Sequence, residues 1–151
     1  MAADYFETSA LLKLYRPEVG SQKVEDIFRA AAEKPLVANL GVIELFSAFN
    51  RQVRKGTIKV ADYRKFERRF LADLKSGVFD VLSLGDEHFN SAEQLIRNHG
   101  RKRECQAPDA LHLALAISIR DAGDLANFVS SDRALLSLAT AEGLPVINPE
   151  I

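Results

Sequence analysis

Apolar residues along the chain recur at the two spacings that distinguish strands from amphipathic helices. Short apolar runs predict five strands, at the start of the segment 5–15 and over 36–38, 78–82, 127–131 and 145–147. Apolar positions three and four residues apart predict the helices between and after them, over the rest of 5–15 and over 21–34, 40–55, 59–75, 86–98, 110–120 and 133–142. Strands that alternate with helices predict a mainly parallel sheet covered on both faces. We therefore expect an α/β fold, a three-layer α/β/α sandwich.

The length of 151 residues suits one domain, and no repeat or interior linker divides the chain, so we expect a single domain over 1–151. A domain of this size buries roughly 70% of the surface that its unfolded chain exposes, so its core needs neither disulfides nor structural zinc. The single cysteine, Cys105, has no internal partner, which favours a reduced, cytoplasmic setting. No apolar run approaches the length of a membrane span, so we expect neither secretion nor a membrane-spanning segment.

Charge gives no global indication of nucleic-acid binding, because 20 basic and 21 acidic residues leave a net charge of −1. Local patches can still bind phosphates. Three basic groups are present: Arg51, Arg54 and Lys55; Lys65, Arg68 and Arg69; and Arg101, Lys102 and Arg103. Solvated helix faces and helix-end charges explain these groups equally well, so none is assigned to binding.

Four carboxylates from distant parts of the chain fall where the predicted elements change direction. Glu7 ends the first strand, and Asp132 directly follows the fourth. Asp109 opens a helix, and Glu44 lies about one turn into the helix after the second strand. Ligands of open parallel sheets collect beyond the carboxyl ends of the strands, so we expect these side chains to converge there. Clustered carboxylates need a compensating cation, and oxygen-only ligands suit Mg²⁺ or Mn²⁺, which activate water for phosphodiester hydrolysis.

Each acid also has a purely structural interpretation. Asp109 and Asp132 suit the helix N-cap, a role worth about 1 kcal/mol. Glu44 shares a polar stripe with Arg51 that can simply face water. The helix dipole favours Glu7 at a helix start. The metal hypothesis therefore depends on all four acids meeting.

Four stretches of the chain resemble those of PIN-domain proteins of the VapC type, in the same order. They are ETSALLKLY at 7–15, VIELFSA at 42–48, PDALHLA at 108–114, and SSDRAL at 130–135 followed by GLPVINP at 143–149. Each stretch supplies one of the four acids. One such motif is weak evidence, whereas four in register across nearly the whole chain are strong.

The resemblance implies a sandwiched parallel sheet and a Mg²⁺- or Mn²⁺-dependent ribonuclease, the toxin of a toxin–antitoxin pair. It implies that the four acids are catalytic and bind the metal directly or through water, and that Ser9 and Ser131 orient carboxylates or water. It also implies RNA as the substrate, a homodimer, and a small antitoxin protein as a partner.

One position departs from the family pattern, because the first acid is normally Asp and here it is Glu7. The added methylene lengthens the reach of the carboxylate, and productive sites tolerate only about 0.5 Å of misplacement. A second hypothesis is therefore a catalytically weakened PIN-fold module that binds a protein partner or RNA. A third is a phosphoacceptor signalling domain, but the chain shows no clear Lys after a late strand to complete such a site.

The three histidines are interpreted structurally. His112 follows Asp109 in an apolar helix, where a packed, hydrogen-bonded histidine is commoner than a catalytic one. His88 and His99 have no acidic or cysteine partner at ligand spacing and are expected at the surface.

Overall fold

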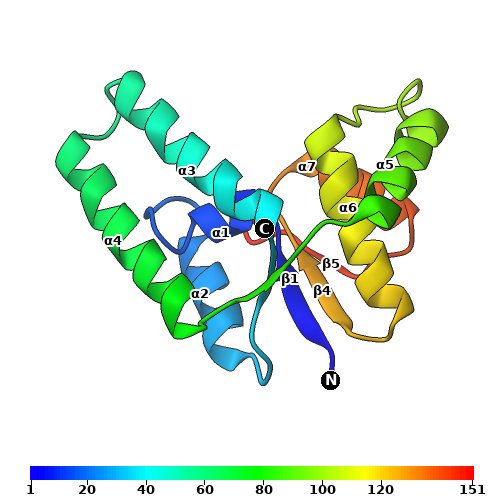
Figure 1. The fold of residues 1–151 in the computed structure, drawn as a ribbon, viewed down its shortest axis with the longest axis horizontal. Coiled ribbons are helices and arrows are strands. Elements are labelled where there is room, and N and C mark those ends of the chain that lie inside the picture. The colour runs from blue at the N-terminus through cyan, green and yellow to red at the C-terminus, as the bar shows by residue number, and fades with distance from the viewer.

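The computed structural model describes all of residues 1–151 and shows a five-stranded sheet between two layers of helices (Figure 1). The strands are β1 (Ala3–Phe6), β2 (Leu36–Ala38), β3 (Asp80–Leu82), β4 (Leu125–Val129) and β5 (Val146–Ile147). The helices are α1 (Thr8–Leu12), α2 (Ser21–Ala30), α3 (Asn39–Arg54), α4 (Val60–Ser76), α5 (Asp86–His99), α6 (Ala107–Asp121) and α7 (Arg133–Ala141). The sheet has the order β3-β2-β1-β4-β5, and every neighbouring pair is parallel. The predicted α/β sandwich is confirmed.

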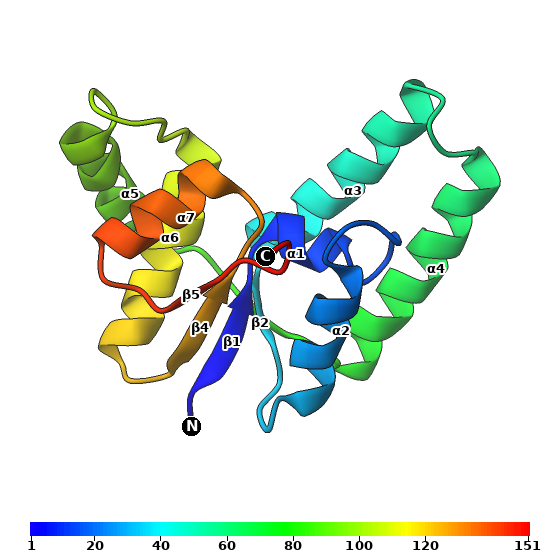
Figure 2. The same ribbon diagram turned by 180° about the vertical axis from the view of Figure 1, so that it is seen from behind.

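Two apolar clusters pack on opposite faces of the sheet. Successive side chains on a strand point to opposite faces, and the two aromatic residues of β1 accordingly enter different clusters. Tyr5 packs in the cluster under α5, α6 and α7, whereas Phe6 packs in the cluster under α1 to α4. The two layers lie on opposite sides of the sheet in both ribbon views (Figures 1 and 2).

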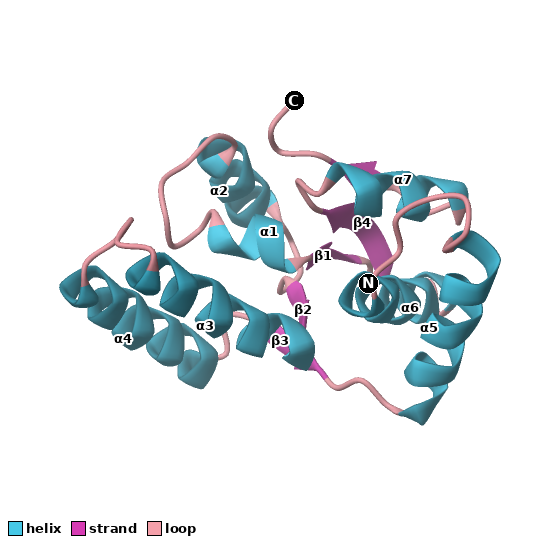
Figure 3. Cartoon of the chain, turned by 90° about the horizontal axis from the view of Figure 1, so that it is seen from above, coloured by secondary structure: helices cyan, strands magenta, loops and turns pink.

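The helices α3 and α4 form a hairpin held together by aromatic rings. Phe49 of α3 stacks on Phe66 of α4 with ring centroids 3.7 Å apart, and Phe46 contacts the same ring at 5.6 Å. The connection between the helices includes Gly56, whose φ of 75° lies in the left-handed region that favours glycine. The α3–α4 hairpin projects from the sheet on the side away from α5, α6 and α7 (Figure 3).

Parallel strands bring their carboxyl ends to one edge of the sheet, and here β2, β1 and β4 are neighbours. The chain leaves β1 into α1, β2 into α3 and β4 toward α7. Because α6 precedes β4 and returns to it through a short turn, its first residues also lie at that edge (Figure 1). None of the helices combines the length and the hydropathy needed to cross a membrane.

Candidate active site

All four predicted acids lie at the carboxyl edge of the sheet. Glu7 is the residue after β1, and Asp132 follows β4 by three residues. Glu44 lies in the second turn of α3, and Asp109 lies in the first turn of α6. Four segments far apart in the sequence therefore each place one acid at the same edge of the sheet.

The charges of the acids act on one another and on a shared tyrosine. Burial raises the pKa of Tyr5 well above its ordinary value, and the negative charges of Glu7 and Glu44 raise it further. Burial also raises the pKa of Asp109 to about 6, helped by the negative charges of Asp132 and Glu7. Like charges close together disfavour ionisation in this way. The acids thus form one electrostatic group.

Glu7 is buried, with 7% of its surface exposed, and hydroxyl groups hold its carboxylate. One oxygen, Oε2, accepts hydrogen bonds from the Ser9 backbone N–H at 3.1 Å, the Ser9 hydroxyl at 2.5 Å and the Ser130 hydroxyl at 2.8 Å. Its bond to the Ser9 N–H makes Glu7 the N-cap of α1. Glu7 is therefore a helix-start carboxylate and also a member of the acidic group.

Glu44 is held by a chain of donors from three other elements. Its Oε1 accepts from the Thr8 hydroxyl at 2.7 Å and from His112 Nε2 at 2.5 Å. Because a carboxylate oxygen only accepts, Nε2 carries a hydrogen, and in the neutral imidazole Nδ1 accepts from the Tyr5 hydroxyl at 2.6 Å. Burial alone would raise the pKa of Glu44. The hydrogen bond from His112, the positive charge of His112 when it is protonated, and the hydrogen bond from Thr8 together outweigh burial and lower that pKa. Glu44 does not simply face water.

The two aspartates differ in their local roles. Asp132 is the N-cap of α7 and accepts a hydrogen bond from the Leu135 N–H at 3.1 Å. Asp109 is not an N-cap, because α6 begins earlier than expected and Gln106 occupies that position. Capping therefore accounts for Asp132 but not for Asp109.

No cation of the protein compensates most of this group. Glu44 faces His112, but Glu7, Asp109 and Asp132 form no ion pair with any Lys, Arg or His side chain. Oxygen donors with unmatched negative charge fit a hard divalent cation such as Mg²⁺ or Mn²⁺. No three acidic, histidine or cysteine side chains are placed to hold one ion together, however. The acids share one neighbourhood without forming a preassembled metal cage.

The serine contacts differ from those that the sequence indicates. Ser9 touches the acids as expected, but the second hydroxyl on Glu7 belongs to Ser130 and not to Ser131. Ser131 instead donates its backbone N–H to the Ser9 hydroxyl at 2.9 Å. Ser130 is fully buried, so solvent does not compete for its hydroxyl. The register of β1 against β4, with Phe6 opposite Val129, puts Ser130 beside Glu7.

Sequence reasoning missed His112, Tyr5 and Thr8 as members of this site. His112 is buried and hydrogen-bonded, as expected, but its partner is one of the acids. A signal was present, because His112 lies three residues after Asp109 and shares its face of α6. Thr8 directly follows Glu7 and had no comparable signal.

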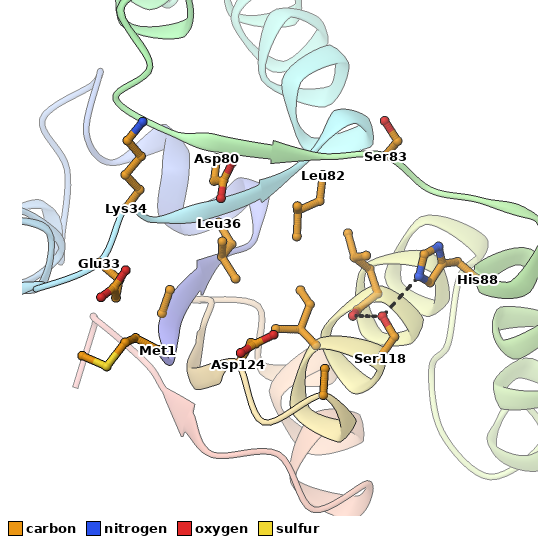
Figure 4. Close-up of a pocket in the computed structure, with 14 residues that line it drawn as sticks. Met1, Glu33, Lys34, Leu36, Asp80, Leu82, Ser83, His88, Ser118 and Asp124 are labelled. Atoms are coloured by element: carbon orange, nitrogen blue, oxygen red, sulfur yellow. Dashed lines mark hydrogen bonds between the residues drawn. The ribbon is translucent and has the colours of Figure 1, made fainter.

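A cavity of about 720 Å³ lies away from the acids, next to the amino ends of β1 and β2 and bordered by β3 and α6 (Figure 4). None of the four acids lines it. His88 borders it, and the expectation that His88 is a surface residue is wrong, since only 8% of it is exposed. Its Nδ1 accepts from the Gly85 N–H at 2.9 Å and its Nε2 bonds to the Ser118 hydroxyl at 3.1 Å. These bonds tie the start of α5 to α6.

The fold and this edge define an α/β protein with an all-parallel sheet and an acidic group beyond its strand ends. A profile of the PIN domain family matches residues 5–141, and the chain therefore belongs to the PIN domain family. Sequence comparison with curated proteins finds no match.

Several solved structures share the fold at low sequence identity. VapC20 from Mycobacterium tuberculosis, a toxin that cleaves the sarcin–ricin loop, is 15% identical with a TM-score of 0.68, over 99% of this chain and 98% of that one. A toxin–antitoxin complex from Klebsiella pneumoniae is 16% identical with a TM-score of 0.65, over 97% and 98%. PAE2754 from Pyrobaculum aerophilum is 20% identical with a TM-score of 0.67, over 99% and 92%. At these identities the likeness concerns the fold.

Proposed function

We propose that this chain is a metal-dependent endoribonuclease that hydrolyses RNA phosphodiesters and serves as the toxin of a toxin–antitoxin pair. The observation that carries the proposal is the uncompensated acidic group at the carboxyl edge of the sheet. Asp109 has its pKa raised to about 6 by burial and by Asp132 and Glu7, and none of these three acids forms an ion pair within the protein. Family membership supports the same reading.

In this proposal Glu7, Glu44, Asp109 and Asp132 hold Mg²⁺ or Mn²⁺, directly or through water. The bound ion would supply Lewis-acid stabilisation of phosphate charge and a more acidic water.

The remaining residues hold the carboxylates in place. The Ser9 and Ser130 hydroxyls fix one oxygen of Glu7, and His112 and Thr8 fix one oxygen of Glu44. Each of these acids keeps its second oxygen free of side-chain hydrogen bonds. Groups that orient metal-binding residues typically matter 10- to 100-fold for metal affinity or activity. The Ser131 backbone N–H donates to the Ser9 hydroxyl and so helps to hold Ser9 against Glu7.

A protein partner also belongs to the proposal. The similar structure from Klebsiella pneumoniae is a toxin–antitoxin complex. On that likeness we propose a small antitoxin as the inhibitor of this chain. The resemblance to VapC-type proteins adds a homodimer to the proposal, and the single cysteine adds the cytoplasm as the location.

The test is cleavage of RNA by the purified protein with Mg²⁺ or Mn²⁺, against Asp109→Asn. This substitution keeps the size of the side chain and removes the charge. We expect wild type to cut and the variant to lose at least 10²-fold in rate, the scale on which removing one electrostatic contact acts in an active site. Equal cleavage by both proteins, or RNA left intact by both at every metal concentration, would contradict the proposal.

The alternative, a catalytically weakened module of the same fold, depends on Glu7. Glu7→Asp restores the residue usual at this position and distinguishes the active ribonuclease from the weakened module. A silent parent that gains activity on this change supports the weakened module, whereas an active parent rejects it. Because Asp cannot reach as far toward Ser130, an active parent should lose rather than gain activity.

A further inference from the structure

Positive charge is concentrated in the α3–α4 hairpin. Residues 39–76 contain nine basic and four acidic residues, a net charge of +5. The rest of the chain contains eleven basic and seventeen acidic residues, a net charge of −6. Two of the three basic groups seen in the sequence therefore belong to one structural unit, although the whole chain is nearly neutral.

The hairpin cations are not used within the protein. All nine are exposed, and none forms an ion pair. Only Arg69 has an aromatic partner, with its guanidinium 4.9 Å from the centroid of the Tyr15 ring. Unpaired like charges repel one another and do not stabilise a hairpin. An external polyanion is the partner that they fit.

One side of α3 joins these cations to the acidic group. Arg51 and Lys55 lie seven and eleven residues after Glu44, so at about 100° per residue all three lie within about 20° of one line along the helix. Lys55 keeps helical backbone angles, which continues the line past the last residue of α3. With a rise of about 1.5 Å per residue, Arg51 lies about 10 Å and Lys55 about 16 Å along the axis from Glu44.

This line faces away from α4. Phe46 and Phe49 lie on the opposite side of α3, where both contact Phe66 of α4. The helix dipole favours cations near a helix end, but it does not require them to share the side that carries Glu44. We call Arg51 and Lys55 the α3 stripe. Seen from above the molecule, α4 lies farther than α3 from α5, α6 and α7 (Figure 3).

We propose that the α3 stripe binds the phosphodiester backbone of single-stranded RNA whose reacting phosphate lies at the acidic group. The inference deepens the proposed function and rests on it for the identity of the nucleic acid. The acids repel a polyanion, so substrate needs cations close to them but outside the group, which is where the stripe lies. Two cations in a single row on one helix match one backbone rather than the two backbones of a duplex. An Arg at the nearer position offers a planar fork suited to phosphate.

The test measures binding without cleavage. Fluorescence anisotropy with a labelled single-stranded RNA, in EDTA and over a range of salt, is run on Asp109→Asn alone and with two added double substitutions. Arg51→Gln/Lys55→Gln removes the stripe. Arg64→Gln/Arg68→Gln removes two equally exposed, unpaired cations on the side of α4 that faces away from Phe66. Thermal unfolding checks that all three proteins are folded.

Loss of two phosphate contacts should lower the slope of log Kd against log salt by about 1.4, from roughly 0.7 per contact for a single strand. We expect this fall, with at least tenfold weaker binding at low salt, for the stripe variant only. Equal losses in both double variants would show that positive charge spread over the whole hairpin attracts the RNA, which would overturn the proposal for the α3 stripe. Unchanged binding in both variants would also overturn it. Absence of RNA binding by all three proteins, with an acidic protein bound instead, overturns it as well.

Failure here is distinct from failure of the proposed function. RNA held through the stripe but left uncut by wild type with Mg²⁺ or Mn²⁺ rejects the ribonuclease and keeps the binding surface. RNA cut by wild type and bound equally by the stripe variant does the reverse.

Discussion

A buried charged residue is paired with opposite charge at one end of α1 and has no such partner at the other. At its C-terminal end Lys13 is 3% exposed, and its ammonium lies 2.8 Å from both Glu18 and Glu150. Burial lowers the pKa of Lys13, but the hydrogen bonds to Glu150 and Glu18 outweigh it and raise the pKa. At the N-terminal end Glu7 is nearly as buried, yet only neutral hydroxyl and N–H donors reach it.

Under the proposed function, this difference separates a structural charge, Lys13, from a metal-binding one, Glu7. The Lys13 cluster is satisfied within the chain and joins α1 to the C-terminal residues. Glu7, Asp109 and Asp132 form no ion pair within the chain, and burial together with the other two acids raises the pKa of Asp109. An arrangement that costs stability in isolation is expected where a ligand supplies the missing charge. Substitutions in the two clusters should therefore change stability with opposite signs.

The largest effect is expected at the compensated end. Lys13→Met keeps the aliphatic stem and removes the ammonium, and we expect the free energy of unfolding in urea to fall by about 2 kcal/mol. This is below the 3–5 kcal/mol of a fully buried pair, because Glu18 and Glu150 can regain water. The matched control is Lys75→Met, at an exposed and unpaired lysine, which should change stability by less than about 0.5 kcal/mol. Equal losses in the two variants would remove the contrast.

The second prediction concerns the hold on Glu44. His112→Leu keeps an apolar packing volume and removes the hydrogen bonds to Glu44 and Tyr5. We expect the Mn²⁺ affinity, measured by calorimetric titration, to fall about 10- to 100-fold, as for other residues that orient metal-binding groups. Thr8→Val removes only one donor to Glu44 and should have a smaller effect. A less stable protein with unchanged Mn²⁺ affinity would make His112 a purely structural residue.

The smallest effect is expected for Asp109→Asn, which should raise the stability of the protein, whereas Lys13→Met should lower it. The pKa of Asp109 in the folded protein is about 6, above the ordinary 3.8, so the folded state binds more protons between these values. The contribution of Asp109 to stability therefore falls as pH rises through that window and stays unfavourable above it. Asp109→Asn should stabilise the protein in EDTA by about 1 kcal/mol at pH 7.5 and by nearly nothing at pH 4. A variant that is less stable than wild type at pH 7.5 would contradict the idea of unmatched charge.

Local patterns made the architecture predictable, because hydrophobic spacing sets each element and alternation of strands and helices requires a parallel sheet. The carboxyl edge followed from the same pattern, and so did the placement of Glu7, Glu44, Asp109 and Asp132 near it. Contacts across the sheet did not follow. Whether Ser130 or Ser131 faces Glu7 depends on strand register, since a shift of one residue reverses the side.

Contacts between helices were equally hidden in the sequence. The bond between His112 and Glu44 depends on how α6 lies against α3, which spacing within either helix does not determine. Asp109 was misplaced as an N-cap because α6 begins at Ala107, before the proline that marks its start. His88 was assigned to the surface because its partners are a backbone N–H and a distant serine, neither of which gives a motif.

Direct measurement of Mn²⁺ binding tests the central claim best. Metal-free protein at pH 7.5 is titrated with Mn²⁺ while the electron paramagnetic resonance signal of the free ion is recorded, for wild type and for Asp109→Asn. The account predicts saturable binding by wild type, accompanied by a rise in Tm, and loss of both in the variant. Failure of wild type to take up Mn²⁺, or equal uptake by the variant, would contradict it.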